Sequence, residues 1–407
     1  MSIAKVEPLT SARGLRGPFD YRLPGEMGDV SVGAVLRVPF GRRRVLGVVV
    51  GLAERSELPD SRLAEPIEAL DPSAPAELVE LGMWLAREYA STPARGIALA
   101  LPPGTVGRGG RRERKELFIT ATAAAGEALR GTERLGARQR AALEQLLAAG
   151  VGTELSATQL SANADRATLR RLAQRGLVTT REAARSARPV TIPVGEPARE
   201  VELNPPQREA VMALGQALEG GSQRRELLLH GVTGSGKTEV YLAGAERALD
   251  MGRGVIALVP EIGLAPQTVT RFRARFGDRV AVLHSSLSER ERRSEWMRLR
   301  TGEARVCVGP RSAAFAPVAD LGLVIVDEEH DPSYKQESDP RYDARVVARE
   351  RARRAGAALI LGTATPRPES WVGLERLELP ERVDGSALPP VEILDMRGRH
   401  GSAGAFH

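Results

Sequence analysis

A glycine-rich segment near the middle of the sequence has the residue types and the spacing of a phosphate-binding loop. Residues 231–238 read GVTGSGKT, the pattern G-x-x-x-x-G-K-T, between an apolar run and a helical stretch. Such a loop turns backbone N–H groups towards phosphate oxygens, its lysine reaches the β- and γ-phosphates, and the hydroxyl that follows ligates Mg²⁺. The residues predicted to bind a nucleotide or its magnesium ion are Gly231, Gly234, Ser235, Gly236, Lys237 and Thr238.

A second chemical signal is the carboxylate cluster DEEH (327–330), which follows the apolar run 323–326 directly. A buried strand that ends in carboxylates delivers them to one edge of a sheet, where Asp327 is placed to hold Mg²⁺ and Glu328 to polarise an attacking water. By itself, an acidic cluster after a strand is often only a solvated loop end. Together with the phosphate-binding loop, it predicts a nucleoside triphosphatase whose catalytic residues are Lys237, Asp327 and Glu328.

Two flanking segments favour a molecular motor over a simple kinase. Gln207 ends the segment LNPPQ (203–207) in front of a predicted helix, where its amide can read the edge of an adenine. The segment GTATP (362–366) carries small hydroxylated residues that can sense the γ-phosphate. Either segment alone is equally consistent with a helix cap or a turn. Glu329 and His330 are expected to contact such neighbouring segments.

These residues need a scaffold that brings them to one place, and the pattern from residue 201 onwards predicts one. Apolar runs alternate with helical stretches, which is typical of a parallel sheet with right-handed crossovers. The predicted strands are 227–230, 255–259, 280–283, 304–309, 323–327 and 358–361. We therefore predict an α/β lobe with a mostly parallel sheet over 201–397, followed by a flexible tail at 398–407.

The N-terminal part of the chain has a different pattern. Residues 1–105 contain β-rich runs at 30–38 and 45–52 and one helical period at 75–89. A glycine-rich, charged linker is predicted at 106–115, because glycines alternate there with arginines. This part is therefore expected to be a separate, β-rich domain.

Residues 116–192 are mostly helical in pattern. The predicted elements are helices at 137–149, 156–162 and 165–174, and a strand at 177–180. Helices followed by a β-wing indicate a winged-helix domain, although three short helices with surface arginines are also consistent with a plain spacer. A second, proline-marked linker is predicted at 193–200.

The composition of the 407-residue chain excludes several classes of protein. Apolar residues make up 42% and charged residues 27%, which rules out a fibrous or wholly disordered chain. No apolar run reaches the roughly 18 residues of a membrane span, and the first residues lack the features of a secretory signal. The single cysteine, Cys307, excludes a disulfide framework and a multi-cysteine zinc site. We expect no bound zinc and a cytoplasmic location.

The positive charge of the chain is a weaker signal. A net charge of +6 is modest for this length and only weakly indicates a nucleic-acid partner. All but four of the 58 basic residues are arginine, and the exceptions are Lys5, Lys115, Lys237 and Lys335. In such a chain each lysine is a candidate for a position that needs a compact ammonium group.

Longer motifs surround these residues. Those in the C-terminal half are GVTGSGKTEVYL (231–242), LVPEIGLAPQT (258–268), VGPRSAAFAP (308–317), VDEEHDPSYKQ (326–336) and LGTATPRPES (361–370). Those in the N-terminal part are FDYRLP (19–24) and RVPFG (37–41). Together they resemble superfamily 2 helicases, in particular the primosomal N′ (PriA) family of replication-restart helicases. The resemblance implies ATP and Mg²⁺ as ligands, a 3′-end DNA-binding domain at 1–105, a winged helix at 116–192 and one RecA-like lobe at 201–397.

The resemblance also implies residues that contact DNA in the helicase lobe. Tyr334, Lys335, Arg341 and Tyr342 fall in a segment similar to the family's aromatic-rich loop, which couples DNA binding to ATP hydrolysis. Aromatic rings and cations side by side can stack on bases and hold phosphates. The alternative is a solvated loop with ordinary tyrosines.

A second set of DNA-binding residues is implied in the N-terminal domain. Phe19, Asp20, Tyr21 and Gly41 correspond to the family's pocket for a 3′-terminal nucleotide. Asp20 can accept a hydrogen bond from a terminal 3′-OH, whereas it would repel an internal phosphodiester. The sequence departs from the family near Ala64, where the family has a basic residue.

The resemblance predicts an ATP-dependent DNA helicase that recognises stalled or branched forks, single-stranded DNA and 3′ ends, and starts primosome assembly. The expected partners are primosome proteins, single-strand-binding protein and the machinery that loads the replicative helicase; no membrane partner is expected. In this family a second RecA-like lobe with an arginine finger, and a cysteine-rich zinc region, follow the first lobe. Because the sequence ends after the first lobe, we expect a polypeptide of these 407 residues to be inactive in unwinding by itself.

Two other functions are left open by the sequence. A non-catalytic, fork-binding scaffold would use nucleotide only as a switch, and ATP turnover with and without forked DNA distinguishes it from an enzyme. An RNA helicase or a restriction-type translocase would share the same core. The motifs at 19–41 argue against that last class.

Overall fold

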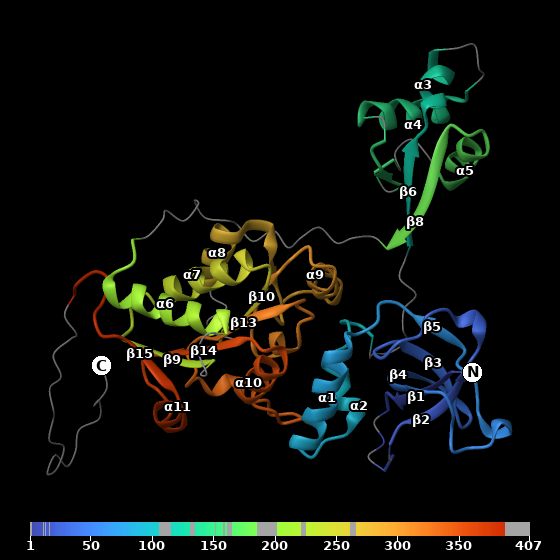
Figure 1. Cartoon of the computed structure of the whole chain (residues 1–407). Helices are drawn as coiled ribbons and strands as arrows, with labels where there is room; N and C mark the ends of the chain where they lie inside the picture. Colours follow the sequence, from blue (N-terminus) through green and yellow to red (C-terminus); the bar gives the residue numbers. More distant parts are fainter. Residues whose placement is uncertain are drawn as a thin grey trace, which may run out of the picture. The chain divides into compact units, whose positions relative to one another are not determined.

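The computed structural model describes residues 2–10, 12, 14–15, 17–105, 115–130, 135–150, 152–157, 159–160, 165–184, 202–220, 225–260 and 266–386. The chain falls into two units, residues 1–103 with 190–407, and residues 104–189; Figure 1 labels their elements. The predicted linkers 106–115 (apart from Lys115) and 193–200, and the predicted tail 398–407, lie outside the described residues. No helix in the described part of the chain is long and apolar enough to span a membrane.

The lobe that carries the phosphate-binding loop is built on a seven-stranded sheet with the order β11-β12-β10-β13-β14-β9-β15. All neighbouring strands run parallel. The strands are β9 (Glu226–Gly231), β10 (Gly254–Leu258), β11 (Val280–Val282), β12 (Val306–Gly309), β13 (Leu321–Val326), β14 (Ala358–Thr363) and β15 (Glu375–Leu379). The prediction of an α/β lobe with a mostly parallel sheet is therefore confirmed.

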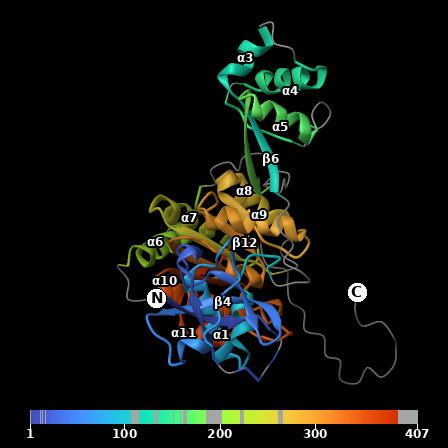
Figure 2. The ribbon, with the colours of Figure 1, turned by 90° about the vertical axis from the view of Figure 1, so that its right-hand side faces the viewer.

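Helices cover both faces of this sheet, with α6, α7 and α8 on one face and α10 on the other (Figures 1 and 2). The helices of the lobe are α6 (Pro205–Glu219), α7 (Lys237–Asp250), α8 (Pro266–Phe276), α9 (Glu289–Arg300), α10 (Ala344–Ala355) and α11 (Pro368–Gly373). Along β10, Val255 and Ala257 belong to the core under α6 and α7, whereas Ile256 and Leu258 belong to the core on the α10 side. Because successive side chains are buried on opposite faces, the central strands consist of continuous apolar runs.

Strand β15 was not predicted, and its sequence explains why. The residues Glu375–Leu379 read ERLEL, and only the last of them is buried. The strand pairs with β9 alone, at the edge of the sheet. An edge strand does not need a continuous apolar run. Because the prediction of strands relied on such runs, this charged strand was missed.

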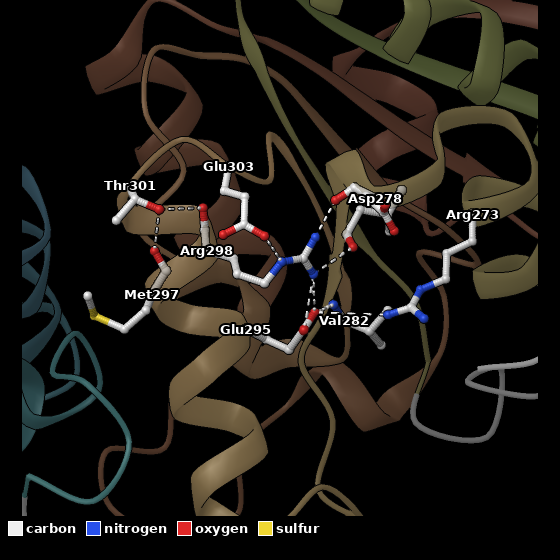
Figure 3. Close-up of polar contacts among 9 residues, drawn as sticks. Arg273, Asp278, Val282, Glu295, Met297, Arg298, Thr301 and Glu303 are labelled. Carbon is white, nitrogen blue, oxygen red and sulfur yellow. Dashed lines mark hydrogen bonds and ion pairs between the residues drawn. The ribbon is translucent and has the colours of Figure 1, made fainter. Parts of the chain in front are cut away.

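A buried ionic network attaches α9 to the opposite edge strand, β11 (Figure 3). Glu295 is fully buried, and its carboxylate oxygens accept hydrogen bonds from Arg298 Nη1 at 3.1 and 3.2 Å. One of these oxygens also accepts from the backbone N–H of Val282 at 2.9 Å and lies 4.0 Å from the guanidinium of Arg273. Because a buried carboxylate needs such partners, the network fixes the position of the helix on the strand.

The N-terminal residues form a five-stranded antiparallel sheet with the order β2-β1-β4-β3-β5. Its strands are β1 (Ser2–Pro8), β2 (Phe19–Leu23), β3 (Val35–Phe40), β4 (Arg43–Ala53) and β5 (Glu68–Leu70), and the helices α1 (Ala76–Glu88) and α2 (Pro93–Ala98) follow. The two helices approach closely, since a Cβ atom added at Gly96 would lie 2.1 Å from the carbonyl oxygen of Gly82. The prediction that the N-terminal part is rich in β-strands is confirmed.

This N-terminal domain shares a core with the lobe that carries the phosphate-binding loop. Leu78, Leu81 and Leu85 on α1 belong to the same buried apolar cluster as Val324 of β13 and Val347 of α10. The predicted segments 1–105 and 201–397 therefore pack as one unit, although about 100 residues separate them along the chain.

Residues 104–189 form the other unit, which combines a small sheet with three helices. The strands β6 (Lys115–Ala121), β7 (Leu155–Ser156) and β8 (Val178–Ala184) are antiparallel in the order β7-β6-β8. The helices are α3 (Ala123–Arg130), α4 (Ala137–Ala148) and α5 (Arg166–Gln174). This set of elements is the one that a winged helix requires.

The predicted helix at 156–162 is wrong over the residues that the structure describes. Ser156 lies in β7, opposite Phe118 of β6, and the described residues after it, Ala157, Gln159 and Leu160, lie in turns. The segment is rich in Ser and Thr, whose hydroxyl groups compete for backbone hydrogen bonds and disfavour a helix interior. The helix that the unit uses instead is α3, which was not predicted.

Candidate nucleotide site and DNA-binding surfaces

The phosphate-binding loop connects the end of β9 to the start of α7, as predicted. Gly234 and Gly236 have φ angles of +83° and +80°, in the left-handed region that favours glycine. A Cβ atom at Gly236 would lie 2.3 Å from the side-chain nitrogen of Gln207, and one at Gly231 would lie 2.5 Å from the hydroxyl oxygen of Ser235. The glycines are therefore required both by backbone conformation and by close packing.

Lys237 lies at the first position of α7, and its side chain is 8% exposed. Its ammonium donates a hydrogen bond to the carbonyl oxygen of Gly231 at 3.0 Å. The same ammonium lies 3.8 Å from a carboxylate oxygen of Glu328. The structure thus brings together the cation of the phosphate-binding loop and the predicted base.

Asp327 follows the last residue of β13 and is partly buried. Its carboxylate accepts hydrogen bonds from the hydroxyl of Tyr241 at 3.0 Å and from the backbone N–H of Glu328 at 3.1 Å. Burial, and then the neighbouring charge of Glu328, raise the pKa of this carboxyl to about 6. A nearby divalent cation would stabilise the ionised form of such a carboxyl group. The carboxylate of Asp327 and the hydroxyl of Thr238 are hard oxygen donors, which suit Mg²⁺. These residues fit the predicted magnesium ion.

Tyr241 is a site residue that the sequence analysis missed. It lies one helical turn after Lys237 in α7, fully buried, so that its hydroxyl reaches Asp327. A Cβ atom added at Gly362 would lie 1.5 Å from the Tyr241 hydroxyl oxygen, which explains the glycine at the start of GTATP. The signal was available in the sequence, because residues i and i+4 of a helix share one face.

The acidic cluster contacts the GTATP segment, as expected for Glu329 and His330. Glu329 is fully buried; its backbone N–H donates to Gly362 O at 3.0 Å, and its carboxylate accepts from Arg367 N at 2.8 Å. His330 Nδ1 lies 2.7 Å from the hydroxyl of Thr363 and 3.5 Å from a carboxylate oxygen of Glu328. His330 therefore connects Glu328, the predicted base, to the GTATP segment, so that a movement of Glu328 can displace Thr363.

Gln207 acts as a helix cap in this structure. It is 2% exposed, its amide oxygen accepts from Asn204 N at 2.9 Å, and its amide nitrogen donates to the carbonyl of Ser235 at 2.9 Å. The helix-cap alternative is thus realised, and the amide also braces the phosphate-binding loop. One hydrogen and one lone pair of the amide are left over, so the contact with adenine stays a prediction.

The stacking role expected of Tyr334 and Tyr342 needs correction. Tyr334 is fully buried, and its hydroxyl lies 2.5 Å from the carbonyl oxygen of Asp327 and 3.1 Å from that of Leu258. Tyr342 is 2% exposed and packs edge-to-face on Phe315 with ring centroids 5.3 Å apart. Rings without exposed faces cannot stack on bases, because tertiary packing already covers them.

The cations of the same segment remain on the surface. Lys335 and Arg341 are both exposed, as contact with a phosphate backbone requires. The ammonium of Lys335 also lies 5.2 Å from the ring centroid of Tyr89, at the end of α1, in a cation–π contact. Their contact with DNA stays a prediction.

The segment 331–343 is held by the N-terminal domain, a contact that the sequence analysis missed. The carboxylate of Asp339 accepts a hydrogen bond from the hydroxyl of Ser91 at 2.5 Å and pairs with the guanidinium of Arg95. The backbone N–H of Asp343 donates to the hydroxyl of Tyr89 at 3.2 Å. These contacts join the end of α1 and the start of α2 to the loop that leads into the nucleotide site. We refer to them as the loop clamp.

The residues predicted to form a 3′-end pocket lie on two faces of β2. Phe19 packs edge-to-face on Phe40 with ring centroids 5.1 Å apart, and the Tyr21 hydroxyl donates to Pro39 O at 2.8 Å. Both contacts lead to the end of β3, next to the turn that begins at Gly41. Asp20 points the other way, because successive side chains of a strand alternate.

Asp20 has its own partners on that second face. Its carboxylate accepts from the hydroxyl of Ser56 at 2.5 Å and lies 3.5 Å from the ammonium of Lys5. Ala64, where the resemblance implies a basic residue, lies beside β2, with its carbonyl accepting from Arg22 N at 2.9 Å. The cation nearest to the Asp20 carboxylate among the described ion pairs is therefore Lys5, on β1.

The N-terminal domain and the lobe with the nucleotide site each match a known protein family. Residues 8–102 match the family model of the PriA 3′ DNA-binding domain, and residues 204–371 match that of the DEAD/DEAH box helicases. The replication restart protein PriA of Bacillus subtilis is 32% identical over 478 residues, which cover 100% of this chain and 59% of that protein. The PriA of Haemophilus influenzae is 32% identical over 389 residues, which cover 94% of this chain and 53% of that protein. The chain thus spans little more than half the length of these relatives.

Two solved structures are similar to part of the chain. The Hef helicase domain of Pyrococcus furiosus has 24% identity and a TM-score of 0.33, and the alignment covers 42% of this chain and 37% of that one. RecG bound to a three-way DNA junction has 22% identity and a TM-score of 0.34, with 47% and 25% covered.

Proposed function

Because the chain belongs to the PriA family of replication restart proteins, we propose that it binds ATP, Mg²⁺ and DNA as part of an ATP-dependent DNA helicase. One observation supports the nucleotide half of this proposal above others. The ammonium of Lys237 and the carboxylate of Glu328 lie 3.8 Å apart, although they come from different elements, α7 and the end of β13. A cation for phosphates and a base for water, at one edge of a parallel sheet, are the parts that a nucleoside triphosphatase needs.

Each residue of the site has a task. Bound Mg²⁺·ATP supplies the phosphoanhydride bond whose hydrolysis drives movement on DNA. The ammonium of Lys237, which donates to the carbonyl of Gly231 in this structure, would pair with the phosphates, and the loop's N–H groups would donate hydrogen bonds to the phosphate oxygens. Asp327 and Thr238 would hold the metal ion. Glu328, beside His330, orients the attacking water and takes its proton.

The DNA half of the proposal is supported by the N-terminal domain. The match over residues 8–102 and the exposed cations of the segment 331–343 support binding of forked, single-stranded or 3′-ended DNA. A protein that restarts replication at such forks acts in the cytoplasm. Its partners would be primosome proteins, single-strand-binding protein and the machinery that loads the replicative helicase.

The loop clamp supports a coupling between the two halves. Arg95 and Tyr89 belong to the domain that receives DNA, whereas the segment they hold leads through Tyr334 to Asp327. A shift of α1 or α2 on DNA binding would therefore move the residues around the metal site. This coupling depends on buried contacts of the tyrosines rather than on their stacking with bases.

A polypeptide of these 407 residues should bind ATP without unwinding DNA. Fast hydrolysis needs a charge placed opposite the γ-phosphate as it leaves, and an arginine finger is worth about 10³–10⁵ in rate in related enzymes. In this family that group is expected from a second lobe, and translocation needs two lobes that close and reopen.

The test of the proposed function is ATP turnover with and without forked DNA, together with the affinity for Mg²⁺·ATP. Lys237→Ala should lower that affinity by about tenfold or more, because a charge-assisted contact with phosphate is lost. Binding of ATP and forks without turnover, even when a second lobe is supplied, would favour the scaffold. Unchanged affinity in Lys237→Ala would refute the nucleotide site.

A further inference from the structure

The residues that follow β15 run along the phosphate-binding loop. The carbonyl oxygen of Leu379 accepts a hydrogen bond from Val232 N at 3.3 Å. Four residues later, Val383 N donates to the carbonyl oxygen of Gly234 at 3.0 Å. The segment Leu379–Ser386 is thus hydrogen-bonded to the loop at its first residue and near its middle, and we refer to it as the strap.

The glycines of the loop show how tightly the strap lies on it. A Cβ atom added at Gly231 would lie 2.9 Å from Cβ of Leu379, and one added at Gly236 would lie 3.1 Å from Cγ2 of Val383. One added at Gly234 would lie 3.8 Å from Cγ of Arg382, the ordinary distance of van der Waals contact. The stem of Arg382 therefore passes over the middle of the loop.

The guanidinium of Arg382 is held from one side and lacks a partner on another. Its Nη1 donates to the hydroxyl of Ser386 at 3.2 Å, and Ser386 is fixed in turn by its hydroxyl and its backbone N–H to the carboxylate of Asp384 at 2.7 and 2.9 Å. Its Nε is buried and has no hydrogen-bond partner among the residues that the structure describes. A buried donor without an acceptor is rare in proteins, and a bound water, ion or ligand can satisfy it.

A second buried group without a partner lies in the loop itself. Ser235 is 1% exposed, and its hydroxyl oxygen makes no hydrogen bond within the described part of the chain. The two unsatisfied groups come from segments far apart in sequence. They are close in the fold, because the stem of Arg382 lies against Gly234, the residue before Ser235. Both would be satisfied by a ligand that carries several acceptor oxygens.

We propose that the strap is a wall of the nucleotide site and that Arg382 is a nucleotide-binding residue, whose Nε–H donates to a phosphate oxygen. The inference rests on the proposed function, because it concerns the same site. A guanidinium suits phosphate through its planar set of donors, and here its aliphatic stem and Ser386 pre-organise it. Arg382 thus adds a second cation to Lys237 on the same lobe.

The experiment measures the affinity of the full 407-residue chain for Mg²⁺·ATP and for Mg²⁺·tripolyphosphate by calorimetry. Arg382→Ala should weaken both by a similar factor of about ten to a hundred, typical of a lost charge-assisted bond. Arg382→Lys should recover part of the loss, because the charge is kept. Arg376→Ala is the matched control: this arginine lies on β15 with its guanidinium 4.2 Å from the ring centroid of Trp371, outside the strap, and its loss should change neither affinity.

The outcomes separate this inference from the proposed function. Affinities within twofold of the unchanged chain in Arg382→Ala, alongside a clear loss in Lys237→Ala, would overturn the role of Arg382 and leave the nucleotide site standing. A loss for ATP but not for tripolyphosphate would overturn the contact with phosphate in favour of the base. Absence of binding by the unchanged chain would overturn both proposals. Equal circular dichroism spectra and melting temperatures of the variants show that folding is not the cause.

Discussion

The hydroxyl of Tyr334 lies 2.5 Å from the backbone carbonyl oxygen of Asp327, the residue proposed to hold Mg²⁺. It is also 3.1 Å from the carbonyl oxygen of Leu258, at the end of β10. One side chain therefore ties the segment with the exposed cations Lys335 and Arg341 to two strand ends of the nucleotide site. Its role follows from burial, and this differs from the stacking role that its sequence context suggested.

Tyr334→Phe should destabilise the protein and leave DNA binding intact. The change removes the hydroxyl donor from two buried carbonyl oxygens, so the free energy of unfolding should fall by about 1–3 kcal/mol. The affinity for single-stranded DNA should stay within twofold, because the ring has no exposed face. Denaturant unfolding and fluorescence anisotropy with a labelled oligonucleotide measure the two effects.

Lys335→Ala is the matched control, because this neighbour is exposed. It should weaken DNA binding and lower the salt dependence of the affinity by about one phosphate contact, with little change in stability. If Tyr334→Phe lost DNA affinity at unchanged stability instead, the tyrosine would have to leave its buried position and stack on DNA.

Arg95→Ala should uncouple DNA binding from the nucleotide site. The change removes the cation that pairs with Asp339 in the loop clamp, whereas all contacts of Lys237 and Asp327 remain. Affinity for Mg²⁺·ATP without DNA should therefore be unchanged, and the effect of forked DNA on that affinity should shrink severalfold. Nucleotide titrations with and without saturating fork measure this difference.

Arg87→Ala provides the comparison for the clamp, since Arg87 is an exposed arginine on α1. It should leave the effect of forked DNA unchanged. An undiminished effect of the fork in Arg95→Ala would show that the two halves communicate by another route, or not at all.

The nucleotide site could be predicted from the sequence because its residues lie in local patterns. The loop at 231–238 fixes its own conformation through its glycines, and buried parallel strands are continuous apolar runs that end at one edge of the sheet. Those two facts alone place Lys237 near Glu328. The structure adds Tyr241 to this group, one helical turn away on the same face.

The contacts between distant segments could not be predicted in the same way. In the sequence, Leu78, Leu81 and Leu85 indicate only that α1 has an apolar face, and the partner of that face, on β13 and α10, is decided by tertiary packing. The burial of Tyr334 and Tyr342 has the same origin, since an aromatic residue next to charged ones has no local signal for its exposure. Strand β15 and its strap were missed because an edge strand needs few apolar residues.

Glu295→Gln should destabilise the helicase lobe strongly. The change neutralises the fully buried carboxylate that accepts from Arg298 and Val282, and it leaves the charge of Arg298 less compensated (Figure 3). Removing one partner of a buried ion pair typically costs about 3–5 kcal/mol. Glu303→Gln is the control, because this carboxylate also pairs with Arg298, at 2.8 Å, but is 60% exposed and should contribute at most about 1 kcal/mol. Equal melting temperatures of the two variants would contradict the role of burial.

Glu7 should make the stability of the chain depend on pH. The side chain of this residue of β1 is buried, and burial raises its pKa from 4.5 to about 7. Because the folded state then holds the proton more tightly than the unfolded state, the contribution of Glu7 to stability is greatest below pH 4.5 and is lost as the pH rises through about 7. Glu7→Gln should therefore raise the melting temperature at pH 8 much more than at pH 5. Glu54→Gln, at an exposed residue directly after β4, should show no such difference. Equal shifts of Glu7→Gln at both pH values would contradict the buried carboxyl.

Asp20→Asn should weaken the discrimination between 3′ ends more than it weakens DNA binding. The carboxylate of Asp20 is held by Ser56 and Lys5, so its charge is fixed at the surface of β2, where it would favour a 3′-hydroxyl end and repel a 3′-phosphate end. The amide keeps the size and the hydrogen bond from Ser56 but removes the charge, so the affinity ratio of the two ends should fall about tenfold. Competition binding with fork DNA that carries either end gives this ratio. Lys5→Ala should raise the affinity ratio of the two ends, because it leaves the carboxylate charge without its neighbouring cation. An unchanged ratio in Asp20→Asn would mean that Asp20 does not contact the DNA end.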